Sequence, residues 1–211
     1  MQKSILSKCK VNVKEVYDTF DASHDWQHIE RVLANADRIM EKEAADPFIV
    51  ELAILLHDVS DPKYKEGDSD PESEILDSLD LSVEQKSRIT DIIRQVSFKG
   101  GNGEAPSSIE AKVVQDADRL DAIGAVGIAR TFAYGGARGR KLYDWDEKPR
   151  NEMSEQEYRD KPTSSATHFY EKLLLLKNMM NTGTGRQIAD ERHQFMLSFL
   201  EQLKKETDGN A

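Results

Sequence analysis

The sequence predicts an all-α protein, and two observations lead to this fold class. Apolar residues recur at intervals of three and four along most of the chain, and no stretch alternates apolar and polar residues convincingly. The composition agrees, because 38% of the 211 residues are hydrophobic and 32% are charged. With a mean hydropathy of -0.65, these values are typical of a helix-rich protein with a well-solvated surface. We therefore expect one domain, residues 1–211, with a substantial core.

In the N-terminal half, apolar periodicity and the residues at the helix ends predict four helices. A short entry helix over 11–20 precedes a longer one over 25–45, whose apolar positions share one face. Asp46-Pro47 starts the next helix, which runs to Asp58, because proline is favoured at the first helical position. Residues 59–70 are polar and turn-like. Ser82, followed by Glu84-Gln85, resembles a cap for a helix that runs through Val96.

Three further helices are expected in the C-terminal half. One runs over about 108–132, and two closing helices cover 164–180 and 187–205. Between the first of these helices and the two closing ones, segment 144–162 contains two prolines, many charges and few apolar anchors. This composition indicates a long mobile loop or lid. The leucine run 173–176 is interpreted as core packing, and a homodimer contact is its alternative use.

Charge and cysteine content argue against several classes of protein. The formal net charge of -10 disfavours nonspecific binding to duplex nucleic acid, which needs cations to displace counterions. No apolar run is long enough for a membrane span, and no signal peptide is visible. Cys9 is the only cysteine, so an intrachain disulfide is impossible. We expect a cytoplasmic protein, and a small phosphorylated substrate stays compatible with the acidic balance because a bound cation can invert the potential of one pocket.

Three separated segments carry side chains suited to a divalent metal ion. His57-Asp58 follows the apolar run 53–56, where an imidazole and a carboxylate are poor packing choices. His24 and His28 lie upstream, four residues apart on one helical face, and Asp118 and Asp121 lie downstream, three residues apart on another. Two imidazoles and two carboxylates form a mixed nitrogen and oxygen site, which suits Mn²⁺, Fe²⁺, Zn²⁺ or, less well, Mg²⁺. Four protein ligands would leave an octahedral ion two open positions for water and a phosphoryl oxygen. The alternative is a buried core histidine and a helix-end salt bridge.

At these residues the chain resembles the HD-domain phosphohydrolase superfamily. The shared pattern is His28, the His57-Asp58 doublet, and Asp118 in an Ala-Asp-Arg-Leu context. Further blocks are similar to small bacterial HD hydrolases that include manganese-dependent nucleotide pyrophosphohydrolases: Val-Ser-Phe-Lys-Gly, Asp-Ala-Asp-Arg-Leu-Asp-Ala-Ile-Gly and Ile-Ala-Arg-Thr-Phe. The resemblance covers about residues 20–200 and implies an HD-domain helical bundle.

The resemblance also implies a ligand set and a reaction. The metal ligands would be His28, His57, Asp58 and Asp118, holding one divalent ion. Mn²⁺ is expected, with Mg²⁺, Co²⁺, Fe²⁺, Ni²⁺ and Zn²⁺ as alternatives. Members with two metals, including oxygenases, place extra histidines between the doublet and the distal aspartate, and none lies between His57 and Asp118 here.

The implied activity is hydrolysis of nucleoside or deoxynucleoside triphosphates to monophosphate and pyrophosphate. Four alternatives stay open: a phosphomonoesterase, a cyclic-nucleotide phosphodiesterase, a nonenzymatic metal-dependent nucleotide sensor, and a redox enzyme, which would need a second iron. Product analysis separates the first two from the implied activity, and an absence of turnover identifies the third.

Further side chains are candidates for contact with water or substrate. Asp61 stands where related HD nucleotidases carry a carboxylate that positions or deprotonates water, although an aspartate before proline is also common in turns. His24 either lines the pocket and meets a phosphate or caps the first long helix. Lys63 and Lys99 either neutralise substrate charge or are merely solvated. The basic glycine-rich loop 135–141 is either a phosphate clamp or a flexible surface loop.

Overall fold

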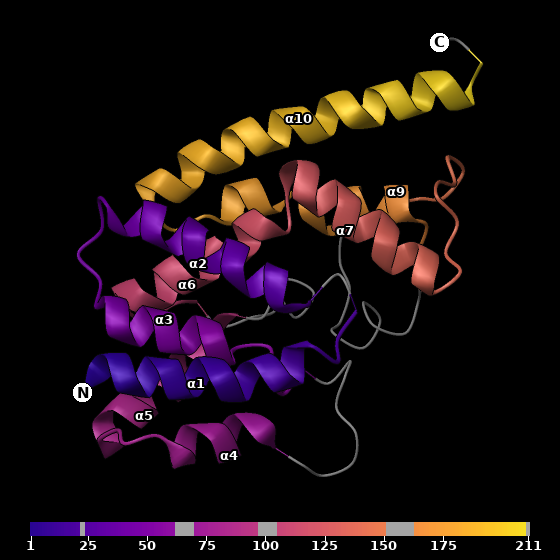
Figure 1. Cartoon of the computed structure of the whole chain (residues 1–211). Coiled ribbons are helices and arrows are strands. Elements are labelled where there is room, and N and C mark those ends of the chain that lie inside the picture. The colour runs from indigo at the N-terminus through magenta and orange to yellow at the C-terminus, as the bar shows by residue number, and fades with distance from the viewer. Residues whose placement is uncertain (22–23, 62–69, 97–104, 151–162, 210–211) are drawn as a thin grey trace. The chain divides into compact units, whose positions relative to one another are not determined.

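A computed structural model describes residues 1–21, 24–61, 70–96, 105–150 and 163–209 (Figure 1). Within these ranges the regular secondary structure is helical and includes no β-strand, which confirms the all-α prediction. None of the described helices combines the length and the apolar composition that a membrane span requires. The described residues form two compact units, unit 1 up to Asp118 and unit 2 from Arg119 onward. That the chain acts as a single domain stays a prediction.

Unit 1 is built around α3. Its helices are α1 (Gln2–Tyr17), α2 (Trp26–Met40), α3 (Pro47–Leu56), α4 (Pro71–Ser78), α5 (Val83–Val96) and most of α6 (Ile109–Asp121). Helix α3 packs against α1, α2 and α5, and Figure 1 shows it between α1 and α2. Eight of its ten residues are buried, because nearly every position around it faces another helix. Its C-terminal end therefore delivers His57 and Asp58 to the interior.

The starts of three helices follow from capping side chains that the sequence displays. The Asp25 carboxylate accepts the backbone N–H of His28 at 3.1 Å and caps α2. Asp46 caps α3 in the same way, with Pro at the first helical position. Before α5, the Ser82 N–H donates to the Gln85 side chain at 3.0 Å, and the Gln85 N–H donates to the Ser82 hydroxyl at 3.2 Å. These reciprocal bonds form a capping box, so the predicted starts are confirmed.

Two features of unit 1 differ from the sequence expectation. Helix α1 begins at Gln2 rather than near residue 11, because a stripe of buried residues at every fourth position extends its apolar face: Ile5, Cys9, Val13 and Tyr17. Helix α4 lies beyond the expected turn and was not anticipated. It is capped by Asp70, which precedes Pro71 as Asp46 precedes Pro47 in α3.

Unit 2 packs its long C-terminal helix against α7. Its elements are α7 (Gly124–Ala137), α9 (Ser165–His168), the π-helical segment η2 (Phe169–Leu173), the 3₁₀ segment η3 (Leu176–Met179) and α10 (Gly183–Thr207). Three aromatic rings pack together in this unit, with centroids 5.7–6.1 Å apart: Phe132, Phe169 and Phe199. Leu173 and Leu176 are buried, as the packing interpretation requires, whereas Leu175 is 46% exposed. The homodimer stays a prediction.

The prediction of continuous helices over 108–132 and 164–180 was wrong in both cases. The first breaks between α6 and α7, where Gly124 has a φ of +76° that a right-handed helix does not use. The second divides into α9, η2 and η3, with the Leu174 N–H donating to the Phe169 carbonyl at 2.9 Å in a π-type bond. Helix α10 begins four residues before the expected Gln187.

The start of the predicted lid is anchored within unit 2. Residues 144–150 form no helix or strand. The Trp145 indole donates to the Thr207 hydroxyl at 2.9 Å, and the Arg150 guanidinium pairs with Glu171 at 2.7 Å. The remainder of the predicted loop, 151–162, lies outside the described residues.

Candidate metal centre

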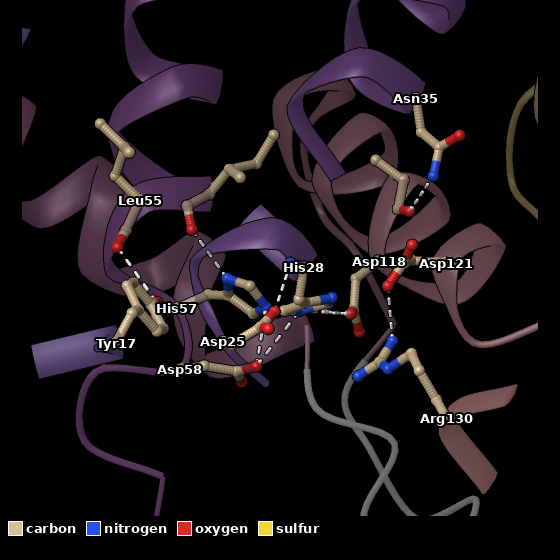
Figure 2. Close-up of polar contacts among 12 residues, drawn as sticks. Tyr17, Asp25, His28, Asn35, Leu55, His57, Asp58, Asp118, Asp121 and Arg130 are labelled. Atoms are coloured by element: carbon tan, nitrogen blue, oxygen red, sulfur yellow. Dashed lines mark hydrogen bonds and ion pairs between the residues drawn. The ribbon is translucent and has the colours of Figure 1, made fainter. Parts of the chain in front are cut away.

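Three helices of unit 1 bring four potential ligand side chains together (Figure 2). His28 lies in the first turn of α2, His57 and Asp58 directly follow α3, and Asp118 lies in the C-terminal part of α6. One nitrogen or oxygen from each of His28, His57 and Asp58 lies within 4.8 Å of the other two. Asp118 joins this group, with its Oδ1 lying 3.6 Å from His28 Nε2 and 3.8 Å from His57 Nε2. The four residues that the sequence singled out therefore meet at one place.

Imidazole nitrogens and carboxylate oxygens face a common point in this quartet. Asp58 Oδ2 lies 3.4 Å from His28 Nε2 and 3.3 Å from His57 Nε2. The two imidazole side chains are 0% and 2% exposed, whereas those of Asp58 and Asp118 are 17% and 29% exposed. Solvent therefore reaches the quartet from the side of the carboxylates.

The orientation of His57 fits a metal ligand. Its Nδ1 lies 2.8 Å from the Ile54 carbonyl, an acceptor that directs Nε2 toward the quartet. That Nε2 is buried and forms no hydrogen bond within the part of the chain that the structure describes. Two imidazole nitrogens and two carboxylate oxygens that converge at 3.3–3.8 Å suit a divalent cation of the Mn²⁺, Fe²⁺ or Zn²⁺ kind.

The electrostatics of the quartet couple His57 to both carboxylates. Burial alone would lower the pKa of the His57 imidazole, but the charges of Asp58 and Asp118 outweigh burial and hold it well above its usual value. Burial would likewise raise the pKa of each carboxyl. His57 nevertheless holds the Asp58 pKa well below its usual range and lowers that of Asp118 to about 2. A cation that binds Nε2 therefore replaces a proton there.

The remaining predicted site residues fall into two groups. His24 lies beside the quartet, with its ring edge-on to His28 and the two centroids 5.8 Å apart. The Asp61 N–H donates to the Asp58 carbonyl at 3.0 Å, so Asp61 occupies the turn that immediately follows the doublet. Lys63 and Lys99 lie outside the described residues.

The sequence analysis did not predict two buried side chains that hold the ends of the helices carrying the quartet. The Tyr17 hydroxyl donates to the Leu55 carbonyl at 3.1 Å, and the Asn35 amide donates to the Ala117 carbonyl at 3.1 Å (Figure 2). Leu55 lies two residues before His57, and Ala117 directly precedes Asp118. The role of Asn35 could have been predicted, because this polar residue interrupts the apolar face of α2. The sequence offers no comparable indication of the Tyr17 contact.

One acidic residue of the Asp118 block has a different role. Asp121 is buried in unit 2 and pairs with the Arg130 guanidinium, 2.7 Å from Nη1 to Oδ2. It therefore joins the start of unit 2 to α7.

This arrangement belongs to a known class. The HD-domain family model matches residues 25–123, a segment that contains all four side chains of the quartet. The chain belongs to the HD-domain superfamily of metal-dependent phosphohydrolases, and it is a metal-dependent hydrolase.

Similar proteins match nearly the whole chain. It is 45% identical over 202 residues to YpgQ of Bacillus subtilis, covering 93% of this chain and 91% of YpgQ. The crystal structure of YpgQ in complex with ADP has a TM-score of 0.75 and 42% identity, covering 97% of this chain and 96% of that one. A Lactobacillus plantarum protein is similar at a TM-score of 0.87 and 33% identity, covering 98% of both chains. An HD-superfamily hydrolase from Bacillus thuringiensis is similar at 0.73 and 41%, covering 99% of both.

Proposed function

We propose that this metal-dependent phosphohydrolase cleaves nucleoside or deoxynucleoside triphosphates to monophosphate and pyrophosphate. The quartet of His28, His57, Asp58 and Asp118 carries the proposal, because its donors suit an ion that activates phosphate chemistry. A second observation supports a nucleotide as the substrate, because the similar protein YpgQ has been crystallised in complex with ADP.

In this proposal the quartet holds one divalent ion, and Mn²⁺ is the ion that we expect. The mixture of two imidazoles and two carboxylates favours a first-row transition metal over Mg²⁺. When bound, the ion supplies Lewis acidity toward a phosphoryl oxygen and toward water. The Ile54 carbonyl fixes the ring of His57 for this role, as hydrogen-bond partners of metal-bound histidines generally do.

The other residues act on water and on phosphate. Asp61 accepts the proton of the attacking water, and its bond to the Asp58 carbonyl keeps it in the turn beside the doublet. His24, next to His28, donates to a phosphate oxygen. Lys63 and Lys99 neutralise the charge of the polyphosphate, as phosphoryl transfer requires.

A substrate panel with matched variants tests this function. The wild type, Asp58→Ala and Asp37→Ala are incubated with nucleotides and Mn²⁺, Mg²⁺, Co²⁺ or Zn²⁺, and the products are identified. Asp37 is an exposed aspartate on α2, so its variant removes an acidic side chain away from the quartet. We expect pyrophosphate as the product, a loss of at least about 100-fold in Asp58→Ala, and normal turnover in the control.

Several outcomes would contradict the proposal. Turnover near the wild-type rate in Asp58→Ala, with helicity unchanged by circular dichroism, refutes the ligand assignment. Release of nucleoside and inorganic phosphate from a nucleoside monophosphate, with no pyrophosphate from any triphosphate, identifies a phosphomonoesterase. Opening of a cyclic nucleotide to its monophosphate identifies a cyclic phosphodiesterase. Tight nucleotide binding without turnover in the presence of every metal identifies a sensor.

A further inference from the structure

A second group of polar side chains gathers at the C-terminal end of α7, within unit 2. Tyr134 lies in the last turns of α7, Arg138 and Arg140 follow the helix, and Ser165 begins α9. The Arg138 guanidinium lies over the Tyr134 ring at 3.6 Å from its centroid, and that of Arg140 lies 5.4 Å from the same centroid. One aromatic ring therefore holds two cationic side chains close together.

The backbone fixes the geometry of this group. The Arg140 N–H donates to the Gly135 carbonyl at 2.9 Å, and the Ser165 N–H donates to the Lys141 carbonyl at 3.0 Å. A methyl group on Gly135 would collide with the Ser165 hydroxyl and would lie 3.6 Å from Arg140 Cβ. The serine hydroxyl and the base of the arginine side chain therefore meet over a residue that has no side chain.

Two donors in this group have no acceptor within the described ranges. Ser165 Oγ and Arg140 Nε are both buried, and neither has a hydrogen-bond partner among the residues that the structure describes. Ser165 is only 2% exposed. Native proteins rarely leave a buried donor unsatisfied, and an ion or water that completes the bond is a common explanation.

The neighbouring carboxylates form ion pairs or hydrogen bonds with other residues. Asp144 pairs with Lys141 at 2.8 Å, and Glu147 accepts the Ser164 N–H at 2.9 Å. Glu171 pairs with Arg150 at 2.7 Å. Within the described ranges, no carboxylate pairs with Arg140, so an anion from outside the chain would balance its charge.

We propose that Arg140 and Ser165, beside Arg138 on Tyr134, form a binding site for a tetrahedral oxyanion such as a phosphate group. A guanidinium and a hydroxyl can donate to two different oxygens of one phosphate, and the planar fork of arginine matches this ligand. Two sources supply such a group: the polyphosphate of the substrate, or a free phosphate or pyrophosphate ion.

Pyrophosphate titration of the full-length protein, freed of metal by a chelator and dialysed, tests the site without a contribution from the quartet. Calorimetry compares the wild type with Arg140→Gln and Ser165→Ala. Lys148→Gln is the control, because it removes one charge from an exposed side chain in the neighbouring segment. We expect affinity to fall by roughly tenfold or more in both site variants, as the loss of a charge-assisted hydrogen bond predicts, and to stay within about twofold in the control.

Steady-state kinetics then distinguish the two sources, an arm that rests on the proposed function. A raised KM for the nucleoside triphosphate with unchanged kcat in Ser165→Ala assigns the bound group to the substrate. An unchanged KM together with weakened pyrophosphate binding assigns a free anion. Equal pyrophosphate affinity in the wild type and both site variants, or no binding by the wild type, overturns the site whatever the turnover. Thermal melting checks that each variant is folded, and Ser165→Ala carries the test if Arg140→Gln is not.

Discussion

The hydroxyl of Tyr17 donates to the backbone carbonyl of Leu55 at 3.1 Å and thereby joins α1 to the last turn of α3 (Figure 2). Tyr17 is fully buried, and burial raises the pKa of its phenol well above the usual value, so the group stays a donor. Leu55 precedes His57 by two residues. Because α1 ends before the segment that matches the HD domain, a residue outside that match supports the end of the helix that presents the doublet.

Tyr17→Phe should weaken both the fold and the metal affinity. The substitution keeps the ring but leaves the Leu55 carbonyl buried without this donor, which costs about 1–3 kcal/mol. A displaced helix end would also misplace His57 and Asp58, so we expect a raised dissociation constant for Mn²⁺. Urea unfolding measures the first effect, and calorimetric metal titration measures the second.

Tyr170→Phe is the matched control for this prediction. It removes a hydroxyl from a ring that is 42% exposed, and it should change stability by less than about 0.5 kcal/mol. A normal Mn²⁺ affinity in Tyr17→Phe, despite lowered stability, would show that the hydroxyl supports the fold alone.

The His57-Asp58 doublet could be predicted from the sequence because its signal is local, whereas His28 and Asp118 were assigned through the resemblance to the HD-domain superfamily. His57-Asp58 follows a run of four apolar residues, where a polar pair needs a reason to be buried. The capping residues Asp25 and Asp46 likewise mark the starts of their helices through hydrogen bonds that span two or three positions. Such signals depend only on neighbouring residues, so they can be recognised without knowledge of the tertiary structure.

The supporting contacts could not be read because they join distant parts of the chain. Tyr17 and Leu55 are 38 positions apart, and Asn35 and Ala117 are 82 apart. No periodicity specifies which buried carbonyl a tyrosine will meet. The break before Gly124 was hidden for a related reason, since a glycine in an apolar stretch does not reveal the sign of its φ angle.

Glu72 should make stability depend on pH. Its pKa is raised from 4.5 to about 6, first by burial and then by the neighbouring Asp70 carboxylate. The folded state therefore holds the proton more tightly than the unfolded chain. Stability falls as the pH rises from 4.5 to about 6 and stays lower above that range.

Glu72→Gln tests this dependence, because the amide keeps the size of the side chain and removes its charge. We expect the variant to exceed the wild type in stability at about pH 8 by on the order of 1 kcal/mol, a value reduced for partial exposure. At about pH 4 the two proteins should be nearly equal. Urea unfolding at both pH values provides the measurement, and a pH-independent difference would exclude ionisation of Glu72 as the cause.

The Cys9 thiol should be inert in the folded protein. Its side chain is fully buried in α1, and burial, assisted by Glu51, raises its pKa to about 12. Since the thiolate is the reactive form, a thiol-specific chromogenic reagent should label almost no native protein. In concentrated urea it should label one thiol per chain, because Cys9 is the only cysteine. Rapid labelling without denaturant would indicate that α1 opens readily.

Gly124→Ala should destabilise unit 2 through the left-handed turn that separates α6 from α7. Gly124 has a φ of +76°, and an added methyl would lie 2.9 Å from the Arg192 side chain, so strain and a close contact together should cost about 1–3 kcal/mol. Gly136→Ala is the control in the same helix, because a methyl there meets no atom within 4 Å, and it should be neutral or stabilising by up to about 1 kcal/mol. Urea unfolding of both variants gives the comparison. Equal losses would mean that α7 tolerates no methyl at either end, and the loss at Gly124 would then not report the left-handed turn.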